Sequence, residues 1–129
     1  MLSEDIVDKM LNCHRKVRCV MLIGEDGEII EFACKPNIDV ILTKDDLQRY
    51  AKQAAARKKE RESWNDKMGS VECVCAVREK LCILVFYWLN KIILLSIDRL
   101  APLAAVEKAI EVYIQYTKVG GADSKPLYP

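Results

Sequence analysis

The alternation of apolar and polar positions predicts a helix at the start of the chain, followed by a β-hairpin. Four apolar residues recur at helical spacing: Ile6, Met10, Cys13 and Val17. Ser3 stands before them and is a residue type that caps helices, so the helix is expected to begin there. Two apolar runs, VRCVMLI and IIEFACK, then flank an Asp-Gly pair. Because glycine adopts positive φ freely, this pair predicts the tight turn of a hairpin.

A long charged helix is predicted over residues 44–68. Thr43 and Asp46 have the spacing of a capping box at its start. Gly69 is expected to end it, because glycine is the usual residue just beyond a helix C-terminus. The strand SVECVCAV follows, and Arg78-Glu79-Lys80 are expected to turn the chain into the next strand.

The most apolar stretch, LCILVFYWLNKIILLSI, begins at Leu81 and raises the question of a membrane span. A spanning helix needs about 20 apolar residues, and Asn90 and Lys91 interrupt this run. A lysine at the centre of a bilayer costs roughly 2.5–3.5 kcal/mol. Because asparagine tolerates positive φ, Asn90 instead predicts a tight turn between two buried strands. No membrane span is expected.

A last helix, PLAAVEKAIEVYIQYTK, completes the pattern, with Pro102 at its first position and Gly120 and Gly121 at its end. The order α-β-β-α-β-β-β-α predicts an α+β fold. Its five-stranded, mainly antiparallel sheet would carry helices on both faces, as a three-layer sandwich. A single domain is expected over residues 1–120, with a flexible C-terminal tail at residues 121–129.

The composition suits a folded domain without a strong overall charge. The chain has 129 residues, of which 51% are hydrophobic and 30% are charged, and its formal net charge is +1. A charge this small gives no general pull toward nucleic acid or anionic lipid. Six cysteines would suit disulfides in a secreted protein, but MLSEDIVDKML lacks the features of a secretion signal. A cytoplasmic location is expected, with the cysteines as small buried thiols.

The order of elements, with VMLIGEDGEIIEFA and its Asp-Gly turn, resembles the roadblock/dynein light chain family within the profilin-like folds. The likeness extends from about Asp5 to Tyr116. The segment KMGSVECVCAVREKLCILVFYWLNKIILLSID is also similar to small archaeal roadblock-like proteins. The resemblance implies a dimer of the chain with itself or with a roadblock paralogue. It also implies a scaffold or regulator of a small Ras-like GTPase, and not an enzyme.

The resemblance places the dimer interface on the long helix and on the following strand, which pairs across the dimer to extend the sheet. The expected interface residues are Leu47, Tyr50, Ala51, Ala54, Ala55 and Lys58 of the helix, and Val71, Cys73 and Cys75 of the strand. Small alanine side chains allow two helices to approach closely. The same stripe is equally suited to docking on the domain's own sheet, so both alternatives stand.

A basic run on the long helix is a second candidate surface for a partner. The run consists of Arg57, Lys58, Lys59 and Arg61, and the expected patch combines Arg57, Lys59 and Arg61 with Trp64, which follows the run. They would suit an acidic partner, with the tryptophan as an anchor. The simpler alternative is a solvated helix face, since Glu60 and Glu62 are interspersed. No aromatic residue interleaves the basic run, so nucleic acid is not an expected partner.

No catalytic residue, metal site or cofactor is expected. His14 is the only histidine, and the chain has no G-x-S-x-G motif, P-loop or dinucleotide-binding loop. Cys73 and Cys75 share one face of a strand, whereas structural zinc usually takes cysteine pairs on turns. A small-ligand sensory module stays an alternative function, although the large aliphatic residues of the predicted strands do not suggest a roomy pocket.

Overall fold

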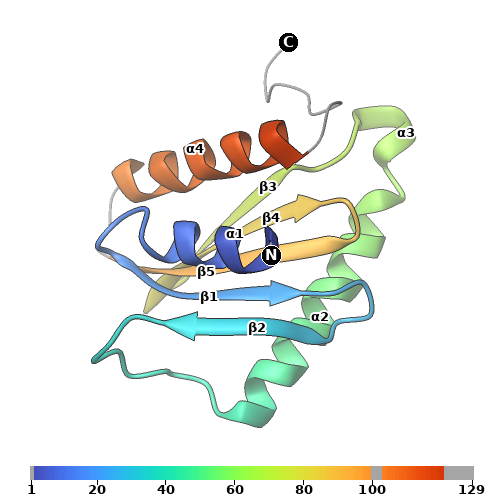
Figure 1. The fold of residues 1–129 in the computed structure, drawn as a ribbon. Coiled ribbons are helices and arrows are strands. Elements are labelled where there is room, and N and C mark those ends of the chain that lie inside the picture. The colour runs from blue at the N-terminus through green and yellow to red at the C-terminus, as the bar shows by residue number, and fades with distance from the viewer. Residues whose placement is uncertain (1, 100–102, 121–129) are drawn as a thin grey trace.

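Figure 1 shows the computed structural model of the chain, which describes residues 2–99 and 103–120. The elements follow the expected order, with one additional short helix after the long one. In chain order they are α1 (Leu2–Leu11), β1 (Val17–Ile23), β2 (Ile29–Cys34), α2 (Lys44–Glu62), α3 (Asn65–Met68), β3 (Cys73–Val77), β4 (Leu81–Trp88), β5 (Lys91–Asp98) and α4 (Leu103–Gly120).

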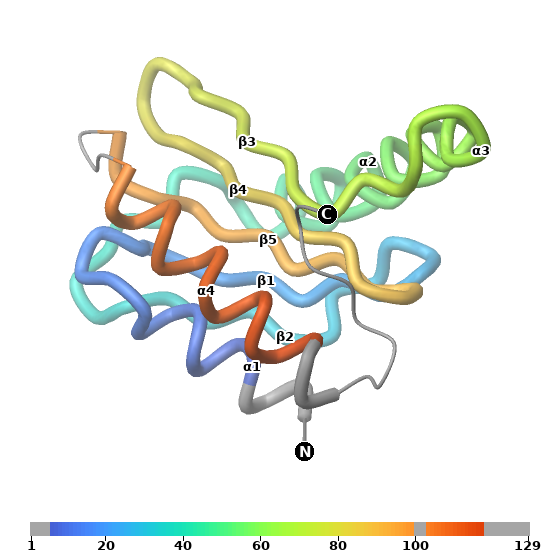
Figure 2. Tube along the Cα trace, turned by 90° about the horizontal axis from the view of Figure 1, so that it is seen from above, coloured from blue at the N-terminus to red at the C-terminus, as the bar shows by residue number. Residues whose placement is uncertain are grey.

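The five strands form one sheet in the order β2-β1-β5-β4-β3, and every neighbouring pair is antiparallel. Helices α1 and α4 cover one face of this sheet and α2 lies on the other, as the view from above shows (Figure 2). The predicted three-layer α+β sandwich is therefore confirmed. Strands β2 and β3 lie at the two edges of the sheet.

Each face of the sheet has its own apolar core, because successive side chains of a strand point to opposite faces. Beneath α1 and α4, the Phe86 ring of β4 is fully buried and stacks on Tyr113 of α4 at a centroid distance of 4.6 Å. On the other face, Ile83 of β4 and Ile92 of β5 pack with alanines of α2. The hairpin of β4 and β5 is covered on both faces, which explains its nearly continuous apolar sequence.

The first helix is shorter than its apolar stripe predicts. It begins at Leu2, so Ser3 lies within the helix and does not cap it. It ends at Leu11, after which the Val17 N–H donates a hydrogen bond of 3.1 Å to the His14 carbonyl oxygen in a turn. Val17 opens β1 and continues the apolar pattern in a strand.

The long helix begins as predicted and ends earlier. The Asp46 N–H donates to the Thr43 hydroxyl, and the Thr43 N–H donates to the Asp46 carboxylate, both at 3.1 Å, which confirms the capping box. The helix ends at Glu62. The Ser63 hydroxyl donates a hydrogen bond of 2.7 Å to the Glu60 carbonyl oxygen, and such local bonds compete with the helical pattern. A turn at Ser63 and Trp64 then leads into the short helix α3, which ends at Met68, the last residue of the predicted span.

Two predicted turns are present, with one difference. Gly27 has a φ of +85°, and a Cβ built on it would lie 2.8 Å from the Lys52 Cα of α2. In the turn between β4 and β5, the residue with positive φ is Leu89, at 55°, and not Asn90. The turn has two residues, closed by the pair Trp88 and Lys91, and type II′ turns of this kind take positive φ at the first position.

Some expectations fall on residues that the structure does not describe. Pro102 and the expected tail at residues 121–129 lie outside the described residues. Gly120 is the last residue of α4. Within residues 2–99 and 103–120, none of the helices is both long enough and apolar enough to cross a membrane.

Candidate interaction surfaces

Strand β3 presents an open edge of the sheet. It pairs with β4 on one side, with Cys73 opposite Phe86 and Cys75 opposite Leu84. On its other side, no strand within residues 2–99 and 103–120 is its neighbour. Cys75 and the residues after it in β3 are exposed, and Val77 exposes 63% of its surface. An open strand edge of this kind is a template for pairing with another chain.

The alanine stripe of α2 faces the chain's own sheet. Ala51, Ala54 and Ala55 expose 0%, 4% and 6% of their surface and pack with Ile83 and Ile92. Of the two alternatives for this stripe, docking on the sheet is therefore the one observed within the chain. Leu47 and Tyr50 are half-buried against the same core. Any helix contact with a second subunit must use residues that this docking leaves exposed.

The two flanks of α2 differ in what they approach. On one flank, the backbone of Lys52 lies against Gly27 in the β1–β2 turn. Toward the other flank, Arg61 reaches β4, the neighbour of the open β3 edge. Tyr50 and Arg57 are spaced seven residues apart and so share one side of α2, and Trp64 follows two residues beyond the end of the helix. The Arg57 guanidinium lies 5.5 Å from the centre of the Tyr50 ring, and Trp64 exposes 55% of its surface.

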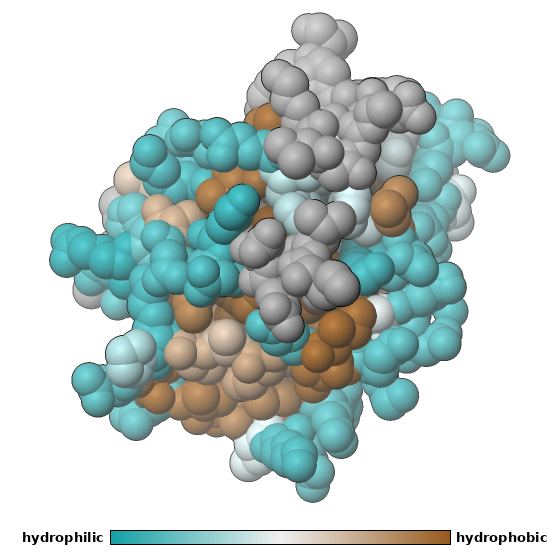
Figure 3. All heavy atoms as spheres, viewed as in Figure 1, coloured by the Kyte–Doolittle hydropathy of each residue, from teal (hydrophilic) through white to brown (hydrophobic). Residues whose placement is uncertain are grey.

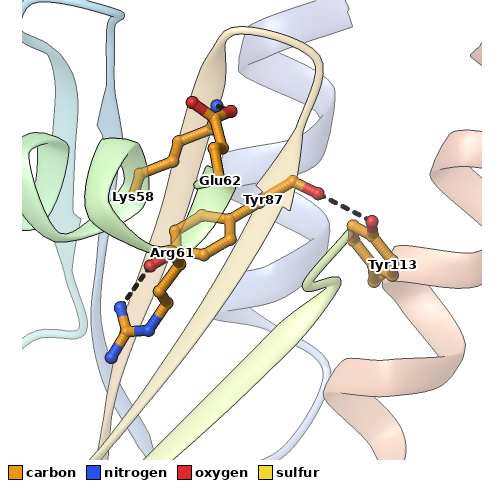
Figure 4. A network of polar contacts seen from close by, with 5 residues as sticks. All are labelled: Lys58, Arg61, Glu62, Tyr87 and Tyr113. Atoms are coloured by element: carbon orange, nitrogen blue, oxygen red, sulfur yellow. Dashed lines mark hydrogen bonds and ion pairs between the residues drawn. The ribbon is translucent and has the colours of Figure 1, made fainter. Parts of the chain in front are cut away.

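The expected basic surface is divided, because some of its cations are engaged within the chain (Figure 4). Arg61 donates a hydrogen bond to the Tyr87 hydroxyl, and Lys58 forms an ion pair with Glu62 at 2.6 Å. The Lys58 ammonium also lies 5.9 Å from the centre of the Tyr87 ring. Lys59 is exposed. Its position, two residues from Arg57, places it on another side of the helix.

A tyrosine pair joins the layers at this end of the sheet. Tyr87 points its ring toward α2, while its carbonyl oxygen accepts a hydrogen bond of 2.8 Å from the Tyr113 hydroxyl of α4 (Figure 4). Burial, with the nearby charges of Glu72 and Cys73, raises the pKa of Tyr113 to about 12. The Tyr113 hydroxyl therefore stays protonated and able to donate at neutral pH.

The cysteines differ from the expectation that all remain thiols. Cys19 of β1 and Cys34 of β2 are bonded in a disulfide, with their Cα atoms 4.0 Å apart. They face each other directly in the hairpin, where the Arg18 carbonyl oxygen and the Lys35 N–H form the adjacent hydrogen bond. The sequence held a signal for this pair, because both cysteines lie seven residues from the Asp-Gly turn.

Three of the free cysteines gather near the β3 edge. Cys73, Cys75 and Cys82 lie on the sheet face that carries α4, according to the strand register. Burial and the neighbouring Cys75 raise the pKa of Cys73 to about 11, and burial followed by Cys82 raises the pKa of Cys75. The Cys73 and Cys75 thiols are therefore protonated at neutral pH and weak as nucleophiles. Within the described residues, no group of three or more His, Cys, Asp or Glu residues is arranged to hold a metal ion.

A groove of about 440 Å³ lies on the α2 face of the sheet, contrary to the expectation of no roomy pocket. We call it the sheet groove. It is bounded by the sheet, the start of α2, the β3–β4 turn and the connector of residues 35–43. Its floor contains the largely buried Met21, Ile83 and Leu94, and its rim contains the half-exposed Val40 and Ile41. The groove lies between the strands and the connector. The apolar periodicity of strands does not define the path of a connector, so the sequence did not predict the groove.

Apolar surface is also exposed outside the groove. On the opposite face, which carries α1 and α4, brown, apolar surface gathers low, where Figure 1 places β2 and the chain beneath it (Figure 3). Ile30 and Phe32 of β2 expose 46% and 36% of their surface. The sequence signal for this surface was the group of apolar residues in the connector, Ile38, Val40, Ile41 and Leu42.

Solved structures share this fold. A roadblock/LC7 domain from Streptomyces avermitilis superposes with a TM-score of 0.65 at 12% identity, over 89% of this chain and 93% of that chain. A structure of MglB with a tetrameric arrangement gives 0.71 at 14%, over 91% and 86%. A profilin from Schizosaccharomyces pombe gives 0.58 at 13%, over 89% and 95%. The fold is therefore of the roadblock type within the profilin-like folds, as the resemblance implied.

A family model defines the chain more narrowly. The model described as a family of unknown function (DUF6659) matches residues 4–119. The chain belongs to this family. A comparison with curated protein sequences finds no match.

Proposed function

We propose that this chain is a non-enzymatic, dimeric, roadblock-like module in the cytoplasm that scaffolds or regulates a small Ras-like GTPase. The observation that carries the proposal is the open edge of β3 on a roadblock fold. Support comes from the structural likeness to MglB, which has been solved in a tetrameric arrangement. Pairing of the open edge with a second subunit would also remove an aggregation-prone surface.

The strand part of the interface follows from symmetry. Two copies related by a two-fold axis pair identical strands antiparallel, so one position of the strand faces its own copy. Cys75 is the middle residue of β3, which runs from Cys73 to Val77. Full overlap of the two strands therefore places Cys75 opposite Cys75 of the second copy. Cys73 then lies opposite Val77 of the second copy, whereas Val71, which was also expected in the strand, precedes β3 and lies outside the paired region.

The helix part of the interface is revised. Because Ala51, Ala54 and Ala55 are buried within the chain, we assign the helix contact to Tyr50 and Arg57 of α2, with Trp64 just beyond the end of the helix. The charge of Arg57 and the exposed Trp64 suit a contact between subunits, since arginine and tryptophan are frequent hot-spot residues.

The first experiment is light scattering on a dilution series of the purified protein. We expect a stable mass of twice the 14.7 kDa monomer. Arg57→Glu should dissociate the dimer at concentrations where the wild type is intact. Lys59→Glu is the matched control, because it makes the same charge change on another side of α2. A monomeric wild type, or equal effects of the two variants, would contradict the proposed interface.

The strand register has its own test. In a variant that keeps Cys75 and replaces Cys13, Cys73 and Cys82 with serine, mild oxidation should cross-link two chains. A variant that keeps Cys73 in place of Cys75 should cross-link much less. Equal cross-linking through both positions would reject the symmetric register.

The GTPase role is tested by binding. Small Ras-like GTPases from the same genome, loaded with GDP or with a non-hydrolysable GTP analogue, would be titrated with the dimer in a calorimeter. We expect one of them to bind with at least tenfold different affinity in its two nucleotide states. A confirmed dimer that binds none of them would leave the scaffold standing and remove the GTPase as its partner.

A further inference from the structure

Contacts within the chain hold the sheet groove in place without a ligand. The Arg18 guanidinium donates a hydrogen bond of 3.0 Å to the Asp39 carbonyl oxygen and so ties the connector to β1. The Cys19–Cys34 disulfide joins β1 to β2 beside the same space. The volume of the sheet groove, about 440 Å³, is typical of small-molecule sites, which range over about 300–1,000 Å³ and are largely preformed.

The lining is chemically divided. The floor and inner wall are apolar, with Ile83 and Leu94 from the sheet and Leu47 from α2. Charges belong to the outer part. Arg78 and Lys80 stand in the exposed β3–β4 turn, with Glu79 between them. Arg18 and Asp39 contribute one charge of each sign, so the five charged residues that line the groove carry a net charge of +1.

We propose that the sheet groove binds a small amphipathic anion, with its aliphatic body on the floor and its carboxylate at Arg78 and Lys80. The apolar floor provides the hydrophobic contribution to affinity. The cations at the mouth select the sign of the head group. Val40 and Ile41 expose 43% and 53% of their surface, and a ligand body in the groove would cover apolar surface that is otherwise in water.

The probes are dodecanoate and dodecyltrimethylammonium, which have the same aliphatic chain and opposite head groups. Each is titrated below its micelle concentration into the full chain, with displacement of anilinonaphthalene sulfonate fluorescence as the signal. We expect saturable binding of one dodecanoate per chain, at least tenfold tighter than binding of the cation. Equal affinity for the two probes would overturn the assignment of the head group.

Two variants locate the site. Ile41→Asp should weaken both probes at least tenfold, and the double variant Arg78→Glu/Lys80→Glu should remove the preference for the anion. Leu89→Asp is the control, because Leu89 is 73% exposed and lies outside the groove. A thermal melt of each variant confirms folding. Unsaturable binding, or equal loss in Ile41→Asp and Leu89→Asp, would overturn the proposal.

The same variants separate this inference from the proposed dimer. Arg57→Glu should leave dodecanoate binding unchanged, and Ile41→Asp should leave the mass from light scattering unchanged. If Ile41→Asp instead produces monomers from a dimeric wild type, the groove is covered by the second copy and the ligand proposal is wrong.

Discussion

The Tyr113 hydroxyl of α4 donates a hydrogen bond of 2.8 Å to the carbonyl oxygen of Tyr87, whose side chain lies on the opposite face of the sheet. The Tyr87 N–H donates to the Glu72 carbonyl oxygen at 3.1 Å. The Tyr87 hydroxyl accepts a hydrogen bond from Arg61 of α2. One residue of β4 therefore links the β3 side of the sheet and both helical layers.

Tyr113→Phe tests this link. The variant removes the hydroxyl and leaves the ring that stacks on Phe86. We expect a loss of about 1–2 kcal/mol in the free energy of unfolding, because a buried carbonyl oxygen loses a partner. Urea titration measures the loss. Tyr87→Phe, which removes a hydroxyl from the Arg61 side, is the control and should cost less. If Tyr113→Phe loses no more stability than Tyr87→Phe, the buried hydrogen bond of Tyr113 contributes no more than the bond between Arg61 and Tyr87.

Stability should fall at alkaline pH. The pKa of Tyr113 rises from 10.0 to about 12 and that of Cys73 from 9.0 to about 11 on folding. Between pH 9 and 12 the unfolded chain loses these protons before the folded chain does, so the unfolded state gains stability as pH rises. The contribution of Tyr113 is complete below pH 10 and lost by about pH 12.

The pH dependence is assigned by comparing variants. In Tyr113→Phe the fall in stability between pH 10 and 12 should be smaller than in the wild type. In Cys73→Ala the fall between pH 9 and 11 should be smaller. Chemical unfolding at a series of pH values measures both. Parallel curves for the wild type and Tyr113→Phe would show that this hydroxyl does not titrate differently in the folded state.

Gly27→Ala should destabilise the contact between the β1–β2 turn and α2. An added Cβ would lie 2.8 Å from the Lys52 Cα, at a residue whose φ is +85°. The control is Gly69→Ala, where φ is +81° and ψ is 167° and nothing lies within 4 Å of the added atom. Both variants carry a backbone cost, about 1–3 kcal/mol, and at Gly69 this cost is the whole effect. Only Gly27→Ala adds the overlap, which costs about a further 1–3 kcal/mol. Equal losses of stability in the thermal melts of the two variants would mean that the overlap with α2 does not destabilise Gly27→Ala.

Leu89→Gly should stabilise the protein. Leu89 has a φ of 55° and exposes 73% of its surface, so glycine relieves the backbone while little packing is lost. The relief of about 1–2 kcal/mol is partly offset by the greater freedom of glycine in the unfolded chain, which leaves a gain of about 0.5–1 kcal/mol. Asn90→Gly, the control, should bring no gain. A higher melting temperature for Asn90→Gly than for Leu89→Gly would mean that Asn90, and not Leu89, has the positive φ.

Local signals account for the elements that were predicted correctly. The capping box of Thr43 and Asp46 and the Asp-Gly turn each depend on residues within a few positions of one another. The same locality explains two errors. Ser3 had the residue type of a cap but lies inside α1, and α2 ends at Glu62, before the glycine that was predicted to end it.

The candidate surfaces were less predictable, since each combines distant segments. The heptad spacing of Tyr50 and Arg57 is visible in the sequence. The flank of α2 that this pair occupies depends on where Gly27 and Tyr87 lie around the helix. The sheet groove depends on the path of a connector that has no periodic pattern.

The sequence by itself determined the order of the elements, the sheet of five strands and the burial of the β4–β5 hairpin, because apolar periodicity and turn residues act over short distances. Only the tertiary structure decided that Ala51, Ala54 and Ala55 face the chain's own sheet and that Cys19 is bonded to Cys34. It also decided that the connector leaves a groove open above Ile83. These features depend on which segments meet across the sheet, and such contacts are absent from any local pattern.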